Sequence, residues 1–246
     1  SQLARKKSKK LVLPKEHGSW AMYLLPVLAG TFLSEPRWEH LLFAIGWFFV
    51  YLASTPLLNI IRNKRKKKQM MPWLIGYGTV AILFLFPLAF QMPELLWFVL
   101  AVLPFLLITV YFINQRNERA LLNDLSGILI LTIGGSASYY IGVQAFTPML
   151  FALILILTAY FLGSAFYVKS LIRELKNPAF KMKSHLYHLL LLVVPFLVNW
   201  VSLIIAYLPS ILRDLFTPRN GKVKPKHSGI IEIVNSAIFF VFLLIL

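Results

Sequence analysis

The chain has 246 residues, of which 59% are hydrophobic and 14% are charged. Soluble domains carry about 25% charged residues, so this composition excludes an ordinary soluble globule and is typical of a polytopic membrane protein. The formal net charge of +16 sits in short basic blocks between long uncharged tracts, which indicates loops and not a face for nucleic acid. The absence of cysteine excludes disulfides, iron–sulfur clusters and thiolate metal sites.

The chain begins with a basic and polar segment, 1–18, and an apolar stretch follows at 19–34. A secretory signal has the same two regions, but no small-residue cleavage site follows here and six more hydrophobic tracts come later. We therefore interpret 19–34 as a retained first span. The predicted organisation is a basic cytoplasmic segment, 1–18, and a single transmembrane domain, 19–246.

Long uncharged tracts separate the ionised residues. At about 20 residues per crossing, the tract 125–168 must hold two helices, and a break is predicted at 144–148, where a proline suits the first turn of a helix. The small residues at 134–138 favour close approach by another helix, or plain packing. The tracts are 17–34, 40–61, 69–93, 95–115, 125–168, 184–212 and 233–246.

The 25 Lys and Arg residues alternate between loops. The segments 1–18, 62–68, 116–119 and 169–183 are basic, whereas the loops between them carry Arg37 alone. Because cytoplasmic loops keep the positive excess, the pattern predicts a multi-pass protein of the bacterial inner membrane with a cytoplasmic N-terminus.

The tract 184–212 decides the number of helices. A single crossing puts 19 basic residues inside and six outside, whereas a hairpin that turns near Asn199 and Trp200 puts 24 inside and one outside. One helix would be about 43 Å long and each hairpin arm about 21 Å, so neither fits a bilayer closely. The charge asymmetry favours the hairpin. We therefore expect an all-α polytopic transmembrane helical bundle of about nine helices, or eight if 184–212 crosses once.

Polar side chains at the inner boundary are the candidates for a ligand site, because polar groups are costly at hydrocarbon depth. No nucleotide-binding glycine loop, nucleophile elbow or zinc-protease motif occurs, so the catalytic residues stay unknown. The ligand-binding candidates are His17, Trp20, Asn59, Arg62, Arg116, Arg119, Asn123, Asp124, Tyr167, Lys169, Ser170, Arg173, Glu174, His185 and His188.

Two helical stripes are expected among these candidates. On a helix that we expect to end at Glu174, helical spacing puts Tyr167 and Ser170 on the face of that carboxylate, next to a stripe with Lys169 and Arg173. The same spacing groups Arg116, Arg119 and Asn123. Arginine binds phosphate or carboxylate groups through paired hydrogen bonds, but ordinary anchors on lipid phosphate use the same residues, as the basic run at 65–68 is expected to do.

Two segments resemble the signature segments of the YwiC-like family of bacterial membrane proteins. They are PKEHGSWAMYLLPVLAG, with His17 to Trp20, and GSAFYVKSLIRE, with Phe166 to Val168. More distantly, the layout and the stretch YFINQRNERALLNDLSGILILTIGGSASYYIG are similar to the UbiA superfamily of intramembrane prenyltransferases. That resemblance implies a UbiA-like arrangement of nine helices, with a substrate diphosphate held by magnesium at aspartate clusters after the second and sixth helices.

The two cluster positions depart from the UbiA pattern. The first reads NIIRN, where Asn59 matches the motif and no aspartate follows, and the second reads YVKSLIRE, with one carboxylate. Magnesium on a diphosphate needs several hard oxygen ligands, so we predict no metal site, although magnesium stays possible as a cofactor. Five cations would neutralise a diphosphate directly: Arg62, Arg116, Arg119, Lys169 and Arg173.

Three hypotheses follow. The first is a UbiA-like enzyme or binder of an isoprenoid, a quinone-like molecule or another anionic lipid-like ligand at the cytoplasmic side. As an enzyme it would be a divergent prenyltransferase that lacks the aspartate motifs. The alternative is a non-catalytic membrane transporter or accessory protein. The third is haem or metal binding through His17, His185 and His188. Membrane lipid is the expected partner, nucleic acid is not expected, and the oligomeric state is left open.

Overall fold

The computed structural model of the protein describes residues 11–15 and 17–246, so most of the basic segment 1–18 lies outside the described residues. The described chain is all helical and contains no strand, which confirms the predicted fold class. Its elements are α1 (His17–Phe32), α2 (Glu39–Arg62), η1 (Lys64–Lys66), α3 (Lys67–Gln91), η2 (Pro93–Leu95), α4 (Leu96–Asn114), α5 (Leu121–Val143), α6 (Pro148–Leu171), α7 (Pro178–Leu190), η3 (Leu191–Val193), α8 (Val194–Leu197), α9 (Leu203–Phe216) and α10 (Pro225–Ile245).

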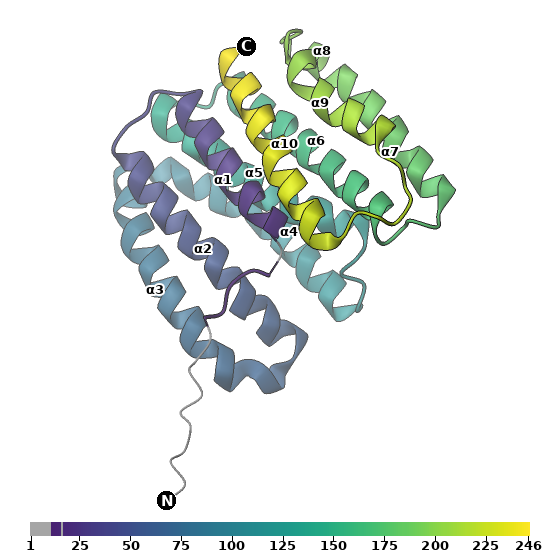
Figure 1. Cartoon of the computed structure of the whole chain (residues 1–246). Helices are drawn as coiled ribbons and strands as arrows, with labels where there is room; N and C mark the ends of the chain where they lie inside the picture. Colours follow the sequence, from purple (N-terminus) through teal and green to yellow (C-terminus); the bar gives the residue numbers. More distant parts are fainter. Residues whose placement is uncertain (1–10, 16) are drawn as a thin grey trace, which may run out of the picture.

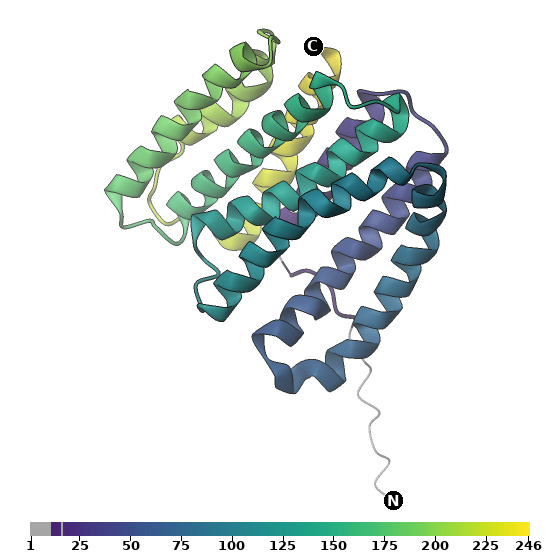
Figure 2. The same ribbon diagram turned by 180° about the vertical axis from the view of Figure 1, so that it is seen from behind.

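Successive helices run up and down through one bundle (Figures 1 and 2). Within the described residues, α7, η3 and α8 follow one another as one rod, so the bundle has the predicted nine rods. The predicted break is confirmed between α5 and α6. Gln144 ends α5 in the left-handed region at φ 56°, and Pro148 begins α6.

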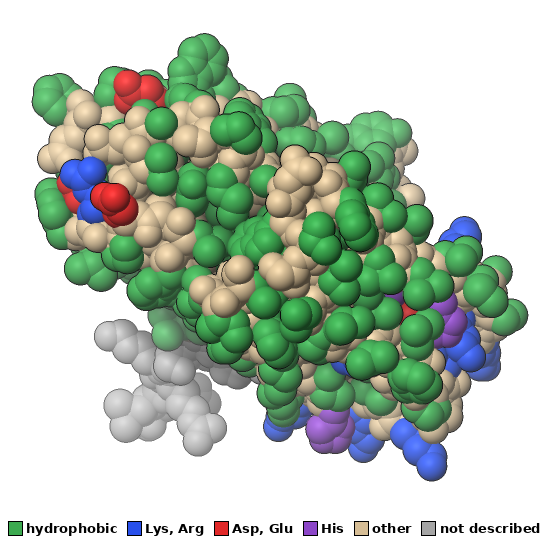
Figure 3. Space-filling view, turned by 90° about the horizontal axis from the view of Figure 1, so that it is seen from above, with side chains coloured by type: hydrophobic (Ala, Val, Ile, Leu, Met, Phe, Trp, Pro, Cys, Tyr) green, Lys and Arg blue, Asp and Glu red, His purple; other side chains and the backbone are tan. Residues whose placement is uncertain are grey.

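The turns gather at two ends of the bundle with different charge. We call one the basic end: it holds the turns 62–68, 115–120, 172–177 and 217–224, at the bottom in Figure 1. The opposite end holds the turns 33–38, 92–95, 144–147 and 198–202. Among the described Lys and Arg residues, Arg37 alone lies at the opposite end. Figure 3 looks onto that end and shows a mainly hydrophobic face with charged atoms at its margins.

The chain reverses at 198–202, so the hairpin predicted for 184–212 is confirmed. Asn199, with φ 54°, stands in the turn between α8 and α9. The first arm begins at Pro178, before the uncharged tract, and the second ends at Phe216, after it. Residues at the basic end therefore extend both arms. The first arm now spans about 30 Å, but α9 has 14 residues and is about 21 Å long, so the expected misfit in length remains for the second arm.

Six helices of the described chain are long and apolar enough to cross a membrane: α2, α3, α4, α5, α6 and α10. The rods α1, α7–α8 and α9 do not meet both conditions of length and composition. Of the apolar windows, 72% is buried in α5 and 56% in α6, against 17% in α3 and 11% in α4. The helices α5 and α6 therefore form the centre of the bundle. The helices α3 and α4 lie at its outside and expose most of their apolar side chains.

Small residues allow α1 and α5 to touch, as the stretch 134–138 suggested. A Cβ atom added at Gly30 would lie 2.1 Å from the carbonyl oxygen of Gly135, and one added at Gly135 would lie 2.6 Å from Pro26. No real Cβ fits at such distances. Glycine at these two positions is therefore what brings the backbones together.

Candidate functional site

The predicted site residues contact two different groups of partners at the basic end. Lys169 of α6 contacts the turn between α4 and α5, whereas Tyr167 and Ser170 contact the segment that follows α9. The single ligand site expected from the sequence is therefore two groups of side chains. We call the first the α4–α5 turn group and the second the Asp214 cluster.

The α4–α5 turn group is held by ion pairs and backbone contacts. Arg62 donates to both carboxylate oxygens of Glu118, at 2.7 and 2.9 Å, and to the side-chain oxygen of Asn59 at 3.2 Å. Lys169 forms an ion pair with Asp124 and donates to the carbonyl oxygen of Arg119 at 2.6 Å. These contacts tie the ends of α2, α5 and α6 to one turn.

Asn123 completes this frame by donating to the carbonyl oxygen of Glu118 at 2.8 Å. Arg116 takes a left-handed conformation, with φ 53°, where the turn leaves α4. A surface depression of about 510 Å³ lies beside it. Its lining residues are Arg62, Ile113, Arg116, Asn117, Glu118 and Arg119. In the described structure, Arg116 and Arg119 are exposed and form no ion pair.

Both predicted helical stripes are wrong because the helices end earlier than expected. The helix α6 ends at Leu171, so Arg173 and Glu174 lie in the following turn. Arg173 is exposed there, and Glu174 accepts a hydrogen bond from Asn177 at 2.9 Å. The helix α4 likewise ends at Asn114, so the two arginines after it belong to a turn and not to a helical face with Asn123.

Trp20, an N-terminal candidate, does not join either group. Trp20 packs between Phe48 and Tyr51, with ring centroids 5.9 and 5.4 Å away. The side chain of His17 lies outside the described residues, so its predicted role stays a prediction. In the part of the chain that the structure describes, no group of three or more His, Asp or Glu side chains is placed to hold a metal ion.

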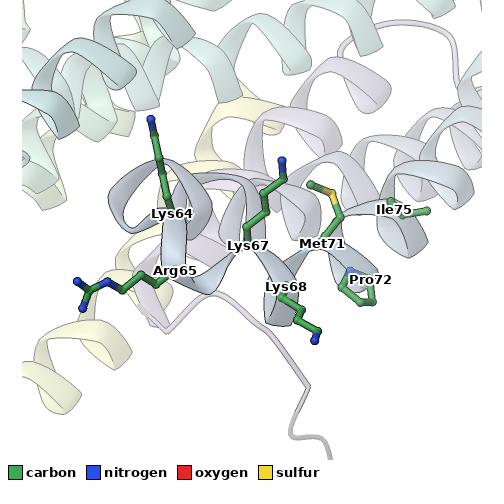
Figure 4. Close-up of a pocket in the computed structure, with 7 residues that line it drawn as sticks. All are labelled: Lys64, Arg65, Lys67, Lys68, Met71, Pro72 and Ile75. Atoms are coloured by element: carbon green, nitrogen blue, oxygen red, sulfur yellow. The ribbon is translucent and has the colours of Figure 1, made fainter.

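A second depression, of about 730 Å³, lies on the turn between α2 and α3. It is lined by Lys64, Arg65, Lys67, Lys68, Met71, Pro72 and Ile75. The charged ends point in different directions and do not converge on one point (Figure 4). This geometry fits cations spread over a charged surface better than a site for one small ligand.

The Asp214 cluster lies between α6, α7 and α9, and its central carboxylate is fully buried. Oδ1 of Asp214 accepts hydrogen bonds from Ser184 and Arg219, each at 2.6 Å. Oδ2 lies 2.6 Å from Nδ1 of His185 and 3.4 Å from Nδ1 of His188. Two donors thus hold one oxygen while two imidazole rings face the other.

Arg219 connects this carboxylate to the end of α6. Its guanidinium donates to Ser170 at 3.1 and 3.3 Å, to the carbonyl oxygen of Thr217 at 2.8 Å, and to that of Asp214. Tyr167 lies beside Thr217, with 3.1 Å between the hydroxyl oxygens. Buried cations are costly unless paired, and Arg219 is paired on every side.

Deeper polar groups continue the cluster toward the middle of the bundle. Arg213 lies over the ring of Tyr167, with Cζ 4.0 Å from its centroid, and donates to Glu232 of α10 at 2.7 Å. Asn235 then donates to Tyr160 at 2.7 Å and to Ser210 at 3.0 Å. Ser170 and Tyr160 are ten residues apart on α6, or about 15 Å. We call this run from Asp214 to Tyr160 the polar column; it reaches about half the depth of a bilayer.

The comparisons with known proteins agree on a family. A model of the family described as YwiC-like protein matches residues 13–139, about half of the chain. A Bacillus subtilis (strain 168) protein with the description "Uncharacterized protein YwiC" is 41% identical over 236 residues, covering 94% of this chain and 95% of its own. The chain belongs to the YwiC-like family.

A second relative of this YwiC-like protein comes from Haemophilus influenzae (strain ATCC 51907 / DSM 11121 / KW20 / Rd), with the description "Uncharacterized protein". It is 33% identical over 236 residues, covering 96% of this chain and 98% of its own. No solved structure matches. The relatives extend over the Asp214 cluster, whereas the family model ends within α5.

Sequence reasoning missed the centre of the buried cluster. It selected Tyr167, Ser170, His185 and His188, but not Asp214. Both histidines face this aspartate directly, and Ser170 is joined to it through Arg219. A signal was present, because Asp214 is one of two aspartates in the chain and adjoins a long apolar tract. Ionisable residues in such positions face a bundle interior and have partners, and here the partners come from α7 and from the segment after α9.

Proposed function

We propose that this YwiC-like protein binds an anionic amphiphile at its basic end. The observation that carries the proposal is the depression beside the α4–α5 turn, where Arg116 and Arg119 are exposed and in no ion pair of the described structure. Arginine favours phosphate and carboxylate head groups because its planar fork donates two parallel hydrogen bonds. The exposed apolar faces of α3 and α4 offer a surface for a hydrocarbon tail.

The proposal places the basic end in the cytoplasm of a bacterial cell, with the bundle in the inner membrane. Its support is the charge asymmetry, since all described Lys and Arg residues except Arg37 gather at one end. Loops rich in Lys and Arg stay on the cytoplasmic side during insertion. The same rule gives a cytoplasmic N-terminus.

The ligand that we favour is an isoprenoid diphosphate or a quinone-like molecule, as the UbiA-like layout implies. In this version the arginines neutralise the head group where UbiA enzymes use magnesium and aspartate. Asp124, in the first turn of α5, is already in an ion pair with Lys169. A divergent prenyltransferase would release diphosphate when an acceptor is supplied. Release that depends on magnesium would indicate that the metal takes part at this site.

The test is retention of farnesyl diphosphate by the full chain, measured by native mass spectrometry from mild detergent, with and without magnesium. A double variant, Arg116→Ala with Arg119→Ala, should lower the bound fraction about tenfold or more, since a hydrogen bond to a charged group contributes about 1.5–3 kcal/mol. Arg37→Ala, at the opposite end, is the matched control. Equal retention by wild type and double variant, or phospholipid alone in the wild type, would overturn the proposal.

The second candidate function is a non-catalytic transporter or accessory protein. The observation that favours it is the polar column, because buried ionisable side chains inside a membrane bundle mark ion and substrate pathways. Ligand flux in reconstituted vesicles separates the two candidates: a binder or transferase holds or converts its ligand, whereas a transporter empties loaded vesicles.

A further inference from the structure

The ring of His188 is the least explained feature of the polar column. The side chain is fully buried, and Nδ1 lies 2.8 Å from the carbonyl oxygen of Ser184, so that nitrogen must carry a proton. Nε2 is also buried and has no hydrogen-bond partner among the described residues. An unpaired polar atom in an apolar bundle is costly, which points to a group that takes up a partner or a proton.

Gly163 of α6 leaves the space in front of this nitrogen. A Cβ atom added at Gly163 would lie 3.3 Å from Nε2 of His188 and 3.3 Å from the ring of Tyr187. Every larger residue would press on the imidazole. Glycine at this position therefore keeps α6 from pressing on Nε2, while Nδ1 faces Asp214.

His185 connects the same carboxylate with the outside. Its side chain is 15% exposed, whereas His188 and Asp214 are fully buried. Both rings face Oδ2 of Asp214, at 2.6 and 3.4 Å, while Ser184 and Arg219 hold Oδ1 in place. The geometry is that of one carboxylate oxygen shared by an outer and an inner imidazole.

We propose that His185, Asp214 and His188 form a proton-binding site inside the bundle that is filled from the basic end. His185 takes a proton from water on Nε2 and passes its Nδ1 proton to Oδ2 of Asp214, so His185 is neutral again and one proton has entered. The Asp214–His188 pair then holds that proton at one of two atoms. It lies on Oδ2 beside a neutral ring, or on Nε2 of His188 beside the carboxylate, because Nδ1 already carries its own proton.

The surroundings keep the site close to electrical balance. The carboxylate of Asp214 is paired with Arg219, and Glu232 is paired with Arg213, so an added proton is the one uncompensated charge. The titratable and charged groups around His188 are Tyr160 and Tyr167 on α6, His185 and Tyr187 on α7, Tyr207, Arg213 and Asp214 on α9, Arg219 after α9, and Glu232 on α10.

A proton-binding site goes beyond the proposed binding of an amphiphile and does not rest on it, because the α4–α5 turn group supplies none of its residues. If the protein is a transporter, the second candidate function, this site would bind the proton that drives transport. Protonation neutralises the carboxylate that holds Arg219 and Ser184, so loading the site would weaken the contacts that join α7 and α9 to α6.

The experiment is a titration of the ring nitrogens by ¹⁵N-histidine NMR on the full chain in lipid nanodiscs. The chain has five histidines, and single His→Gln variants assign the signals. We expect the His188 signal to change reversibly between pH 5 and 8. In Asp214→Asn the midpoint should fall by about one pH unit or more, because the neighbouring negative charge that favours the imidazolium is gone.

Matched controls separate proton binding from a structural role. His40 is buried at the opposite end, with Nε2 2.8 Å from the carbonyl oxygen of Ser138, and its signal should not respond to Asp214→Asn. His227→Gln removes an exposed histidine at the basic end and should leave the His188 midpoint unchanged. His185→Gln should keep the midpoint near its place but slow proton exchange at His188 about tenfold or more.

A second variant keeps the proposal testable if Asp214→Asn does not fold. Gly163→Ala retains every titratable group but fills the space beside Nε2, so protonation of His188 should shift to lower pH. Gly76→Ala, where an added Cβ meets no atom within 4 Å, should leave it unchanged. A His188 signal that stays constant from pH 4.5 to 8.5 in the wild type, or a midpoint that neither Asp214→Asn nor Gly163→Ala moves, would overturn the proposal.

Discussion

Arg213 of α9 donates to Glu232 of α10 at 2.7 Å, and the two side chains are 12% and 9% exposed. The guanidinium also lies on the ring of Tyr167. One buried ion pair therefore joins α10 to the hairpin and to α6. Each charge is compensated mainly by the other, since little water reaches either side chain. Removing one partner therefore leaves the other charge buried and uncompensated.

Glu232→Ala should lower the free energy of unfolding by about 3–5 kcal/mol, the usual cost of breaking a buried ion pair on one side. The double variant Arg213→Met with Glu232→Leu should recover most of that loss, since it removes both charges and keeps the volume. Unfolding in mixed micelles with increasing dodecyl sulfate measures both. A double variant as unstable as the single one would contradict this account of the pair.

The exposed pair of Arg62 and Glu118 should behave differently. Its side chains are 40% and 36% exposed, so water screens the charges, and such pairs contribute about 0–1 kcal/mol. We expect Glu118→Gln to change the free energy of unfolding by less than about 1 kcal/mol in the same assay. A loss as large as that of Glu232→Ala would mean that the α4–α5 turn is a structural support of the whole bundle.

The contact of α1 with α5 depends on the missing side chain of Gly135. Gly135→Ala places a methyl group on the backbone of Pro26, and overpacking costs about 1–3 kcal/mol. Gly127→Ala on the same helix meets no atom within 4 Å and should be neutral or stabilising, because alanine exceeds glycine in helix propensity by about 1 kcal/mol. The thermal unfolding midpoint should fall in Gly135→Ala and should stay the same or rise in Gly127→Ala.

The hairpin makes a topological prediction. The natural sequence has no cysteine, so single cysteines report accessibility without background. A membrane-impermeant maleimide should label Asn199→Cys and Glu94→Cys from the same side, and Lys66→Cys from the other. Labelling of Asn199→Cys together with Lys66→Cys would contradict the reversal of the chain between α8 and α9.

The sequence predicted those features of the fold that depend on neighbouring residues. The apolar tracts, the break before Pro148 and the charge asymmetry depend on residues close together in the chain, and each predicted a real element. The ends of α4 and α6 did not follow from periodicity. Local turns end both helices, with Asn117 donating to the carbonyl oxygen of Phe112 and Glu174 to that of Lys169, and the side chains in these turns fit a helix equally well. The two expected stripes were lost for that reason.

The sequence by itself determined that this is an all-helical membrane protein with two ends of unequal charge and a resemblance to the YwiC-like family, which the comparisons confirm. It favoured a hairpin at 184–212 but left a single crossing open, and the structure decided for the hairpin. Hydrophobic length and local charge decide these properties, and both are written along the chain. The tertiary structure alone decided that Asp214 meets His185, His188 and Arg219, and that Lys169 turns to the other side of α6. Those partners come from separate helices, so only the packing of the bundle brings them together.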